Sequence, residues 1–156
     1  MSEQWFVFKM YGLDELPMLA EYCLKSIEHL DIRAQLRQQR IWRIRWEPGH
    51  EFGGIQLYSD PHLGIGFEIV LDVSGSLDDN VKTVVHEIGH TFEACYFGNF
   101  FERGLLKLFS FNSKEHFELS EKFANTFEKK WLENAKNRAG VTNLLSGRPQ
   151  RTRITI

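Results

Sequence analysis

The segment His86-Glu87-Ile88-Gly89-His90 constrains this chain more than any other feature of its sequence. On a helix, residues four apart lie on one face, one turn above the other, so both imidazoles can reach one metal ion. Zinc binds imidazole nitrogens at about 2.0–2.1 Å, and two histidines supply half of its usual four ligands. Glu87 lies beside the pair, which suits a general base acting on a water at the metal. The segment therefore predicts a helix that carries part of a zinc site.

The residues on either side predict the helix itself. Ser76-Leu77-Asp78-Asp79 has the form of a capping box, with acidic residues at the positive end of the helix. An apolar stripe follows at helical spacing and consists of Val81, Val84, Val85, Ile88 and Phe92. Gly89 is a poor helix former, so its place inside the helix indicates that something approaches the backbone closely. Gly98 is a natural stop signal, and we expect a helix over about 78–97.

A catalytic zinc site needs a third protein ligand, with the fourth position left to water. The next predicted helix carries Glu118, Glu121 and Asn125. Glu121 is the preferred ligand because it falls on the apolar stripe, where a carboxylate needs a partner to offset its desolvation. That stripe consists of Phe117, Ala124, Phe127 and Trp131. Asn125, one turn further on, is placed to bond the far nitrogen of a zinc histidine and set its tautomer. An ordinary surface or salt-bridged glutamate is the alternative for Glu121.

The H-E-x-x-H segment is the signature of zinc metallopeptidases, and a second motif narrows the resemblance. Residues 121–127 read Glu-Lys-Phe-Ala-Asn-Thr-Phe, and the pair resembles the ImmA/IrrE-type metallopeptidases, which combine H-E-x-x-H with E-x-x-A-N on the following helix. The resemblance covers roughly residues 60–131. It implies a zincin-like domain with Glu87 as the catalytic acid/base. The zinc ligands that it implies are His86, His90 and Glu121.

The same resemblance implies a regulatory peptidase whose partner is a protein or peptide substrate, with helix-turn-helix repressors among the substrates of the family. In such peptidases an edge strand pairs with the extended backbone of the substrate. The strand just before the active-site helix, or its neighbour, is the expected edge. The segment between the motifs departs from the family because it is rich in Phe and Leu. This segment, residues 99–111, could close the core, line the substrate groove or form a patch for a partner.

Alternatives to this interpretation remain. Metzincins need Gly three and His six residues after the second histidine, where this chain has Glu93 and Tyr96. SprT-like proteases often use a third histidine, a role open to His116, but His116 lacks the Ala-Asn that accompanies Glu121. A non-catalytic zinc-site scaffold that binds proteins is the rival from another class. Glu87 speaks against it, because a scaffold needs no general base.

The remaining segments predict an α+β class, with a small, mostly antiparallel sheet packed against the active-site helix and supporting helices. Strands are expected over residues 4–11, 41–47, 52–58 and 66–73, and a supporting helix from about 14 to 39. In residues 41–47, Trp42, Ile44 and Trp46 alternate with Ile41 and the charged residues, so the two sets should face opposite ways. The helix that bears Glu121 is expected to fade near Asn137. We expect one domain over 1–140 and a C-terminal tail over 141–156. The basic end of that tail, residues 148–156, is expected to fray, with an added edge strand as the alternative.

Composition excludes some classes of function. A net charge of −2 argues against direct nucleic-acid binding, which needs clustered basic charge. No apolar run approaches the roughly 18 residues of a membrane span, so no membrane partner is expected. Two cysteines are too few for a disulfide framework, and we expect a cytoplasmic enzyme. Four residues are candidates for stabilising an oxyanion: Tyr58, His62, Tyr96 and His116.

Overall fold

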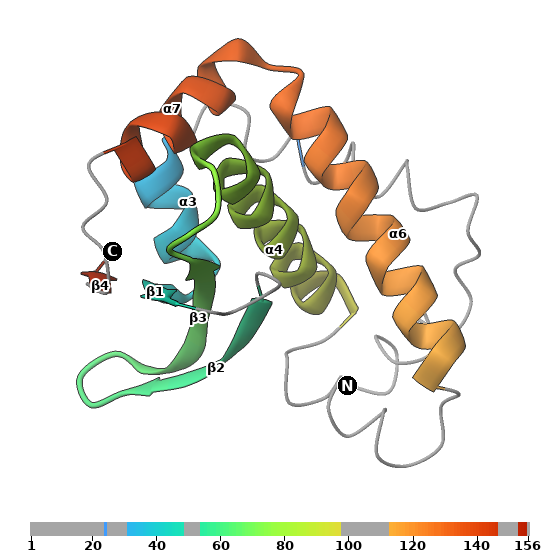
Figure 1. Ribbon diagram of the computed structural model, residues 1–156. Coiled ribbons are helices and arrows are strands. Elements are labelled where there is room, and N and C mark those ends of the chain that lie inside the picture. The colour runs from blue at the N-terminus through green and yellow to red at the C-terminus, as the bar shows by residue number, and fades with distance from the viewer. Residues whose placement is uncertain (1–23, 25–30, 49–53, 98–112, 147–152, 156) are drawn as a thin grey trace.

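The computed structural model describes residue 24 and residues 31–48, 54–97, 113–146 and 153–155 (Figure 1). The side chains of residues 93–97, 113–117, 119–120 and 153–155 lie outside the described part. In chain order the elements are α3 (Ile32–Gln38), β1 (Ile41–Glu47), β2 (Gly54–Asp60), β3 (Gly64–Asp72), α4 (Leu77–Phe97), α6 (Ser113–Leu132), α7 (Ala135–Ser146) and β4 (Arg153–Thr155). The predicted α+β class is confirmed. The strand expected over 4–11 and the segment 99–111 lie outside the described residues.

The described strands form one mixed sheet in the order β2-β3-β1-β4. β2 and β3 form the expected antiparallel hairpin, and β4 pairs antiparallel with β1. The central pair, β1 and β3, is parallel, so the sheet is less antiparallel than the sequence led us to expect. The basic tail thus supplies an added edge strand, which was the alternative to fraying. β3 is an interior strand, and β2 lies at one edge of the described sheet.

An irregularity in β1 decides which side chains face the core. Ile41 pairs with Phe67 and Arg43 with Glu68, so β1 uses one residue more than β3 between these two pairs. Such a bulge reverses the facing of the residues before it. Ile41 is fully buried beside Ile44 in the core, whereas the predicted alternation grouped it with the arginines. That prediction was wrong, because strict period-two counting cannot anticipate an extra residue.

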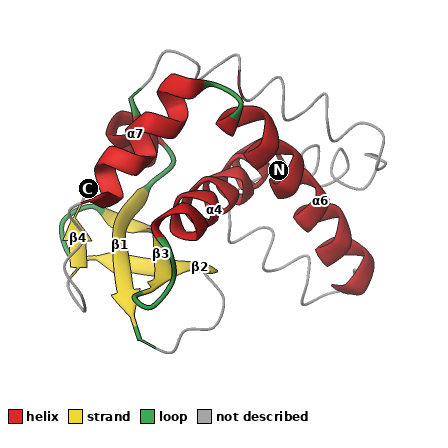
Figure 2. Cartoon of the chain, turned by 45° about the horizontal axis from the view of Figure 1, so that its top comes forward, coloured by secondary structure: helices red, strands yellow, loops and turns green. Residues whose placement is uncertain are grey.

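The described helices pack together above one face of the sheet (Figure 2). α4 lies against α6 along its length, against α7 near its start, and against the sheet through β3 and β2. The predicted stripe of α4 is buried in the shared core: Val81, Val84, Val85, Ile88 and Phe92. The core is completed from α6 by Phe123, Phe127 and Trp131. This packing sets α6 beside the face of α4 that adjoins the stripe.

The ends of two helices differ from the prediction. α3 begins only at Ile32, because Asp31 is in an extended conformation and its carboxylate accepts a hydrogen bond from Ala34 N at 2.8 Å. The helix expected from about 14 to 39 is therefore interrupted before Ile32. α3 packs on β1 and α7. α6 ends at Leu132, and Asn134 Oδ1 then accepts from Lys136 N at 2.9 Å and starts α7. The predicted boundary after residue 140 falls inside α7.

Glu68 is a buried carboxylate on the face of the sheet opposite the core. Only 2% of the residue is exposed, and its oxygens accept from Arg43 and Gln56, with Arg45 Nε at 3.3 Å. Burial by itself raises the pKa of Glu68, but these hydrogen bonds and the two guanidinium charges lower it by more. The net pKa lies below the ordinary 4.5, so folding is coupled to the ionised form.

Glu68→Gln should lower the free energy of unfolding at pH 7 by about 3 kcal/mol, because two guanidinium groups lose their buried partner. Because the folded-state pKa is depressed, the contribution of Glu68 is complete above its ordinary pKa of 4.5 and is lost as pH falls through the lower, folded-state value. Denaturant titrations should therefore show that the difference in free energy of unfolding between the two proteins shrinks as the pH is lowered from neutral to acidic. Glu47→Gln is the matched control, because Glu47 is 43% exposed and pairs with Arg45 at 3.1 Å. An equal cost for the two substitutions at pH 7 would contradict the assignment.

Candidate metal centre

α4 presents the histidine segment on a well-capped helix. Ser76 Oγ accepts a hydrogen bond from Asp79 N at 3.1 Å, which satisfies one of the unpaired amides at the helix start. Asp78 and Asp79 lie in the first turn, where the helix dipole favours negative charge. α4 then runs from Leu77 to Phe97, and the predicted helix over about 78–97 is confirmed. The motif lies in the middle of this helix, away from both ends.

Gly89 allows α6 to approach α4 closely. A Cβ atom at Gly89 would lie 3.1–3.2 Å from the Cβ, Cγ and Cδ1 atoms of Phe127 on α6. Contacts this short are tighter than side chains normally tolerate, so a larger residue at 89 would push the helices apart. The sequence indicated a close approach at Gly89, and the structure identifies Phe127 as the group that makes it. The close packing brings side chains of α6 within reach of both histidines.

His86, His90 and Glu121 converge at this contact between the helices. Glu121 Oε1 lies 3.3 Å from His86 Nε2, and Glu121 Oε2 lies 2.8 Å from His90 Nε2. One ligand atom from each of the three residues lies within 4.8 Å of the other two. The imidazole rings are 4.9 Å apart and nearly perpendicular, at 82°. The three side chains that the sequence singled out are therefore neighbours in space, although Glu121 follows His90 by 31 positions along the chain.

The arrangement fits the donor set of a small divalent cation. Four ligands bound tetrahedrally at about 2.0–2.1 Å lie roughly 3.3–3.4 Å from one another. His86 Nε2 and His90 Nε2 lie 3.3 and 2.8 Å from different oxygens of Glu121, so the three donor groups are already near that spacing. The set comprises two imidazoles and one carboxylate, donors that several first-row divalent cations accept. His86 and His90 are 15% and 12% exposed, so a cation there would be mostly enclosed by protein.

His86 is held from both sides of its ring. Its Nδ1 lies 3.3 Å from Glu128 Oε1, while its Nε2 faces Glu121. Burial by itself lowers the pKa of His86, but the hydrogen bond to Glu128 and the charges of the surrounding carboxylates raise it overall. Glu128 was not among the predicted site residues, and Asn125 was expected to set a histidine tautomer. Asn125 is exposed, and Glu128 contacts His86 instead.

The helical repeat places Glu128 within reach of His86, which Glu121 also contacts. Glu128 follows Glu121 by seven residues, which is two turns of helix, so both point to the same side of α6. Asn125 was predicted to contact a histidine because it lies one turn from Glu121 on the same face. The signal that could have found Glu128 is the seven-residue spacing of two carboxylates on one helix. The structure was needed to show that His86 lies between them.

Glu87 is the most enclosed carboxylate of the site, with 7% of the residue exposed. Burial is the largest influence on its pKa and raises it, and the charges of Glu121 and Glu128 add to that rise. The two neighbouring histidines oppose the rise without cancelling it. A carboxylate whose proton affinity is raised in this way suits a general acid/base better than an ordinary surface glutamate does.

Glu121 lies at the border of the apolar stripe of α6, less buried than expected. Its side chain is 35% exposed, whereas Ala124, Phe127 and Trp131 of the predicted stripe are buried. The hydrogen bond from His90 is the largest influence on the pKa of Glu121 and lowers it, so Glu121 is held ionised beside the histidines. An ionised carboxylate in this position is a ready ligand for a cation.

The other candidate residues either lie apart from the three converging side chains or have side chains outside the described part of the chain. Glu118, an alternative to Glu121, is exposed on α6, and His62 is exposed at the turn between β2 and β3. Tyr58 lies on β2 with the guanidinium of Arg43 3.9 Å from its ring centre, on the face of the sheet opposite the core. The side chains of Glu93, Tyr96, His116 and Phe117 lie outside the described part of the chain.

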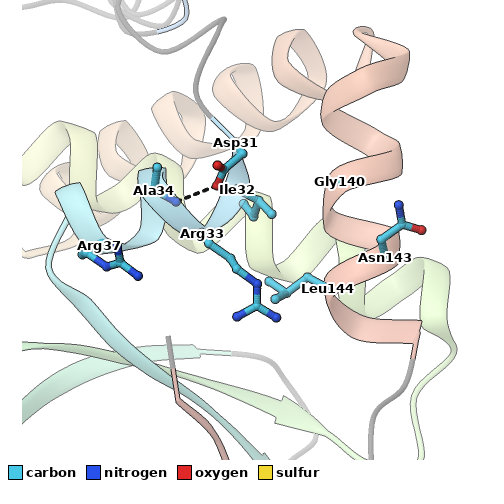
Figure 3. Close-up of a pocket in the computed structure, with 8 residues that line it drawn as sticks. All are labelled: Asp31, Ile32, Arg33, Ala34, Arg37, Gly140, Asn143 and Leu144. Carbon is cyan, nitrogen blue, oxygen red and sulfur yellow. Dashed lines mark hydrogen bonds between the residues drawn. The ribbon is translucent and has the colours of Figure 1, made fainter.

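A hollow of about 550 Å³ lies between α3 and α7, apart from these residues (Figure 3). Its lining consists of Asp31, Ile32, Arg33, Ala34, Arg37, Gly140, Asn143 and Leu144. None of the three converging side chains lines it, nor does Glu87. Arg33 and Arg37 are exposed on the short helix α3, and we do not place the functional site there.

Comparisons with known proteins do not assign this site. No protein-family model matches the chain, and no curated protein or solved structure matches it either. None of the helices in the described ranges combines the length and the apolar character that a membrane span requires. The function must therefore be argued from the chemistry of the cluster between α4 and α6.

Proposed function

We propose that this chain is a zinc-dependent peptidase that hydrolyses a peptide bond in a protein substrate. The observation that supports the proposal most is the convergence of two imidazole nitrogens and a carboxylate oxygen within 4.8 Å of one another. His86, His90 and Glu121 would hold the ion. The resemblance of the two motifs to the ImmA/IrrE-type metallopeptidases supports the same assignment and a zincin-like fold. It also favours a regulatory role, with helix-turn-helix repressors as the first substrates to examine.

The reaction would divide the work between the ion and Glu87. A zinc ion held by these three ligands would supply Lewis acidity toward a water molecule and toward the scissile carbonyl. Glu87 accepts a proton from the attacking water as its oxygen bonds to the carbonyl carbon. Glu87 then donates that proton to the amide nitrogen as the carbon–nitrogen bond breaks. The products are a carboxylic acid and an amine, and Glu87 returns to its starting state.

The burial of Glu87 favours an enzyme over a non-catalytic scaffold. A scaffold needs the three ligands for stability, and a buried carboxylate next to them would only add an unfavourable desolvation cost. In a peptidase the same carboxylate is the proton carrier, and its enclosed position next to the ligands serves that role. Substrate backbone could pair with β2, the strand at the edge of the described sheet, because β3 has neighbours on both sides.

Metal binding and hydrolysis test the proposal together. After reconstitution and removal of excess metal, the protein should carry about one zinc per chain by elemental analysis, as three protein ligands predict. The loaded protein should cleave members of a broad peptide library, a chelator should stop cleavage, and added zinc should restore it. A chain that retains no zinc after careful reconstitution would reject the proposal at its first step.

A further inference from the structure

Glu128 is the carboxylate of the site that neither motif accounts for. Its Oε1 lies 3.3 Å from Nδ1 of His86, and its side chain is 25% exposed. The opposite ring nitrogen, Nε2, faces Glu121 at 3.3 Å. Glu128 therefore contacts the histidine on the side turned away from the converging ligand atoms, where it cannot share the ion with Nε2.

The geometry of α6 explains how both carboxylates reach one ring. Glu121 and Glu128 are seven residues apart, which corresponds to about 10.5 Å along a helix axis. The ring of His86 spans the space between them and contacts one carboxylate at each end. The contact with Glu128 therefore depends on the packing of α6 against α4, which Gly89 and Phe127 set.

A contact of this kind determines which nitrogen of a neutral histidine carries the proton. A carboxylate only accepts hydrogen bonds, so an imidazole beside it places its N–H on that side. Glu121 lies at the same 3.3 Å from Nε2, so the two carboxylates compete for the proton of the metal-free ring. A cation between Nε2 and Glu121 would take the Nε2 lone pair and leave the proton on Nδ1 beside Glu128. Ligating histidines commonly have such a carboxylate partner, which orients the ring and strengthens the metal–nitrogen bond.

We infer that Glu128 is a positioning residue, which holds His86 with its proton on Nδ1 and so keeps Nε2 ready to bind the metal. This inference rests on the proposed zinc site. A competing explanation is that His86 is a protonated imidazolium bridged between two carboxylates, an ion pair that needs no metal. The two explanations predict different zinc affinities for a variant without Glu128. A positioning role predicts weaker zinc binding, whereas an ion pair without a role in metal binding does not.

The test compares Glu128→Ala and Glu128→Gln with Glu118→Ala, which removes the same charge from an exposed position of the same helix. Zinc affinity is measured by competition with a chromophoric chelator, and the thermal unfolding of the metal-free proteins shows that each variant is folded. The proton position on His86 is read from two-bond ¹H–¹⁵N correlations of the neutral ring. Glu128→Ala should weaken zinc binding by about 10–100-fold and redistribute the proton between the two nitrogens. Glu128→Gln should lose less, because its amide oxygen still accepts from Nδ1.

The outcomes separate this inference from the proposed function. If the wild-type protein binds zinc but Glu128→Ala binds it within about twofold as tightly, with the same proton position on His86, the positioning role is wrong and the zinc site stands. If Glu118→Ala loses as much affinity as Glu128→Ala, the effect is one of net charge, and the inference is also overturned. If the wild-type protein binds no zinc, both proposals fail.

Discussion

Glu87→Gln should retain zinc but lose peptidase activity by about 10²–10⁴-fold, the range that a positioned general acid/base contributes. Glutamine has nearly the shape of glutamate, so it should fill the same enclosed site, where 7% of Glu87 is exposed. It cannot accept the proton of the attacking water or return it to the leaving nitrogen. The measurements are zinc content by elemental analysis and the turnover of a cleaved peptide or protein substrate.

The zinc content of the Glu87→Gln variant is the internal control of this experiment. Retained zinc with lost turnover assigns Glu87 to proton transfer, because the metal ligands are untouched. Undiminished turnover would show that Glu87 does not transfer the proton and would contradict the proposed mechanism. The same variant has a second use, because it should hold a bound substrate without cleaving it. Partners captured in this way from an extract identify candidates, among which a helix-turn-helix repressor would agree with the family resemblance.

Glu121→Ala should weaken zinc binding by more than roughly 100-fold, since even the loss of an outer partner of a zinc histidine costs about 10–100-fold. Glu121 Oε1 and Oε2 lie 3.3 and 2.8 Å from the two histidine nitrogens. Its removal therefore takes away the ligand that α6 contributes among the described side chains. Its side chain is 35% exposed, and alanine is a strong helix former, so the variant should fold. Zinc affinity by chelator competition measures the effect.

Glu118→Ala and His116→Ala are the comparisons that make the Glu121→Ala result specific. Glu118 is exposed one turn earlier on α6, and its removal should change zinc affinity by about twofold or less, as expected for an exposed charge. His116 is the third ligand that a SprT-like site would use. A larger loss from either control than from Glu121→Ala would transfer the third ligand to that residue.

Local signals allowed α4 to be predicted well. The capping serine, the apolar stripe and the four-residue spacing of the histidines all lie within one helix, so short-range geometry determines them. The structure bears out each of these features in α4. Gly89 was interpreted correctly as a close approach, but its contact, Phe127, lies on another helix and could not be read from spacing.

Features that depend on contacts between distant segments were predicted less well. The extra residue in β1 turned Ile41 into the core, because the pairing with β3 decides the facing and the sequence of β1 alone does not. The parallel pairing of β1 with β3 and the addition of β4 likewise depend on how the chain crosses the sheet. Asn125 was expected to contact a zinc histidine because it lies one turn from Glu121, whereas Glu128, two turns away, was not among the predicted site residues. Only the position of His86 distinguishes the two.

The amino-acid sequence alone determined the helix of the histidines, the residue types suited to a zinc site and Glu121 as the preferred third ligand. Helical periodicity and donor chemistry depend on the residues themselves and on their near neighbours, so they can be predicted from the sequence alone. Only the tertiary structure decided that the carboxylate of Glu121 contacts both imidazoles and that Glu128 contacts His86 at Nδ1, on the side of the ring opposite Nε2. Those contacts join two helices at one crossing, and the register of that crossing is set by side-chain packing such as that of Phe127 against Gly89.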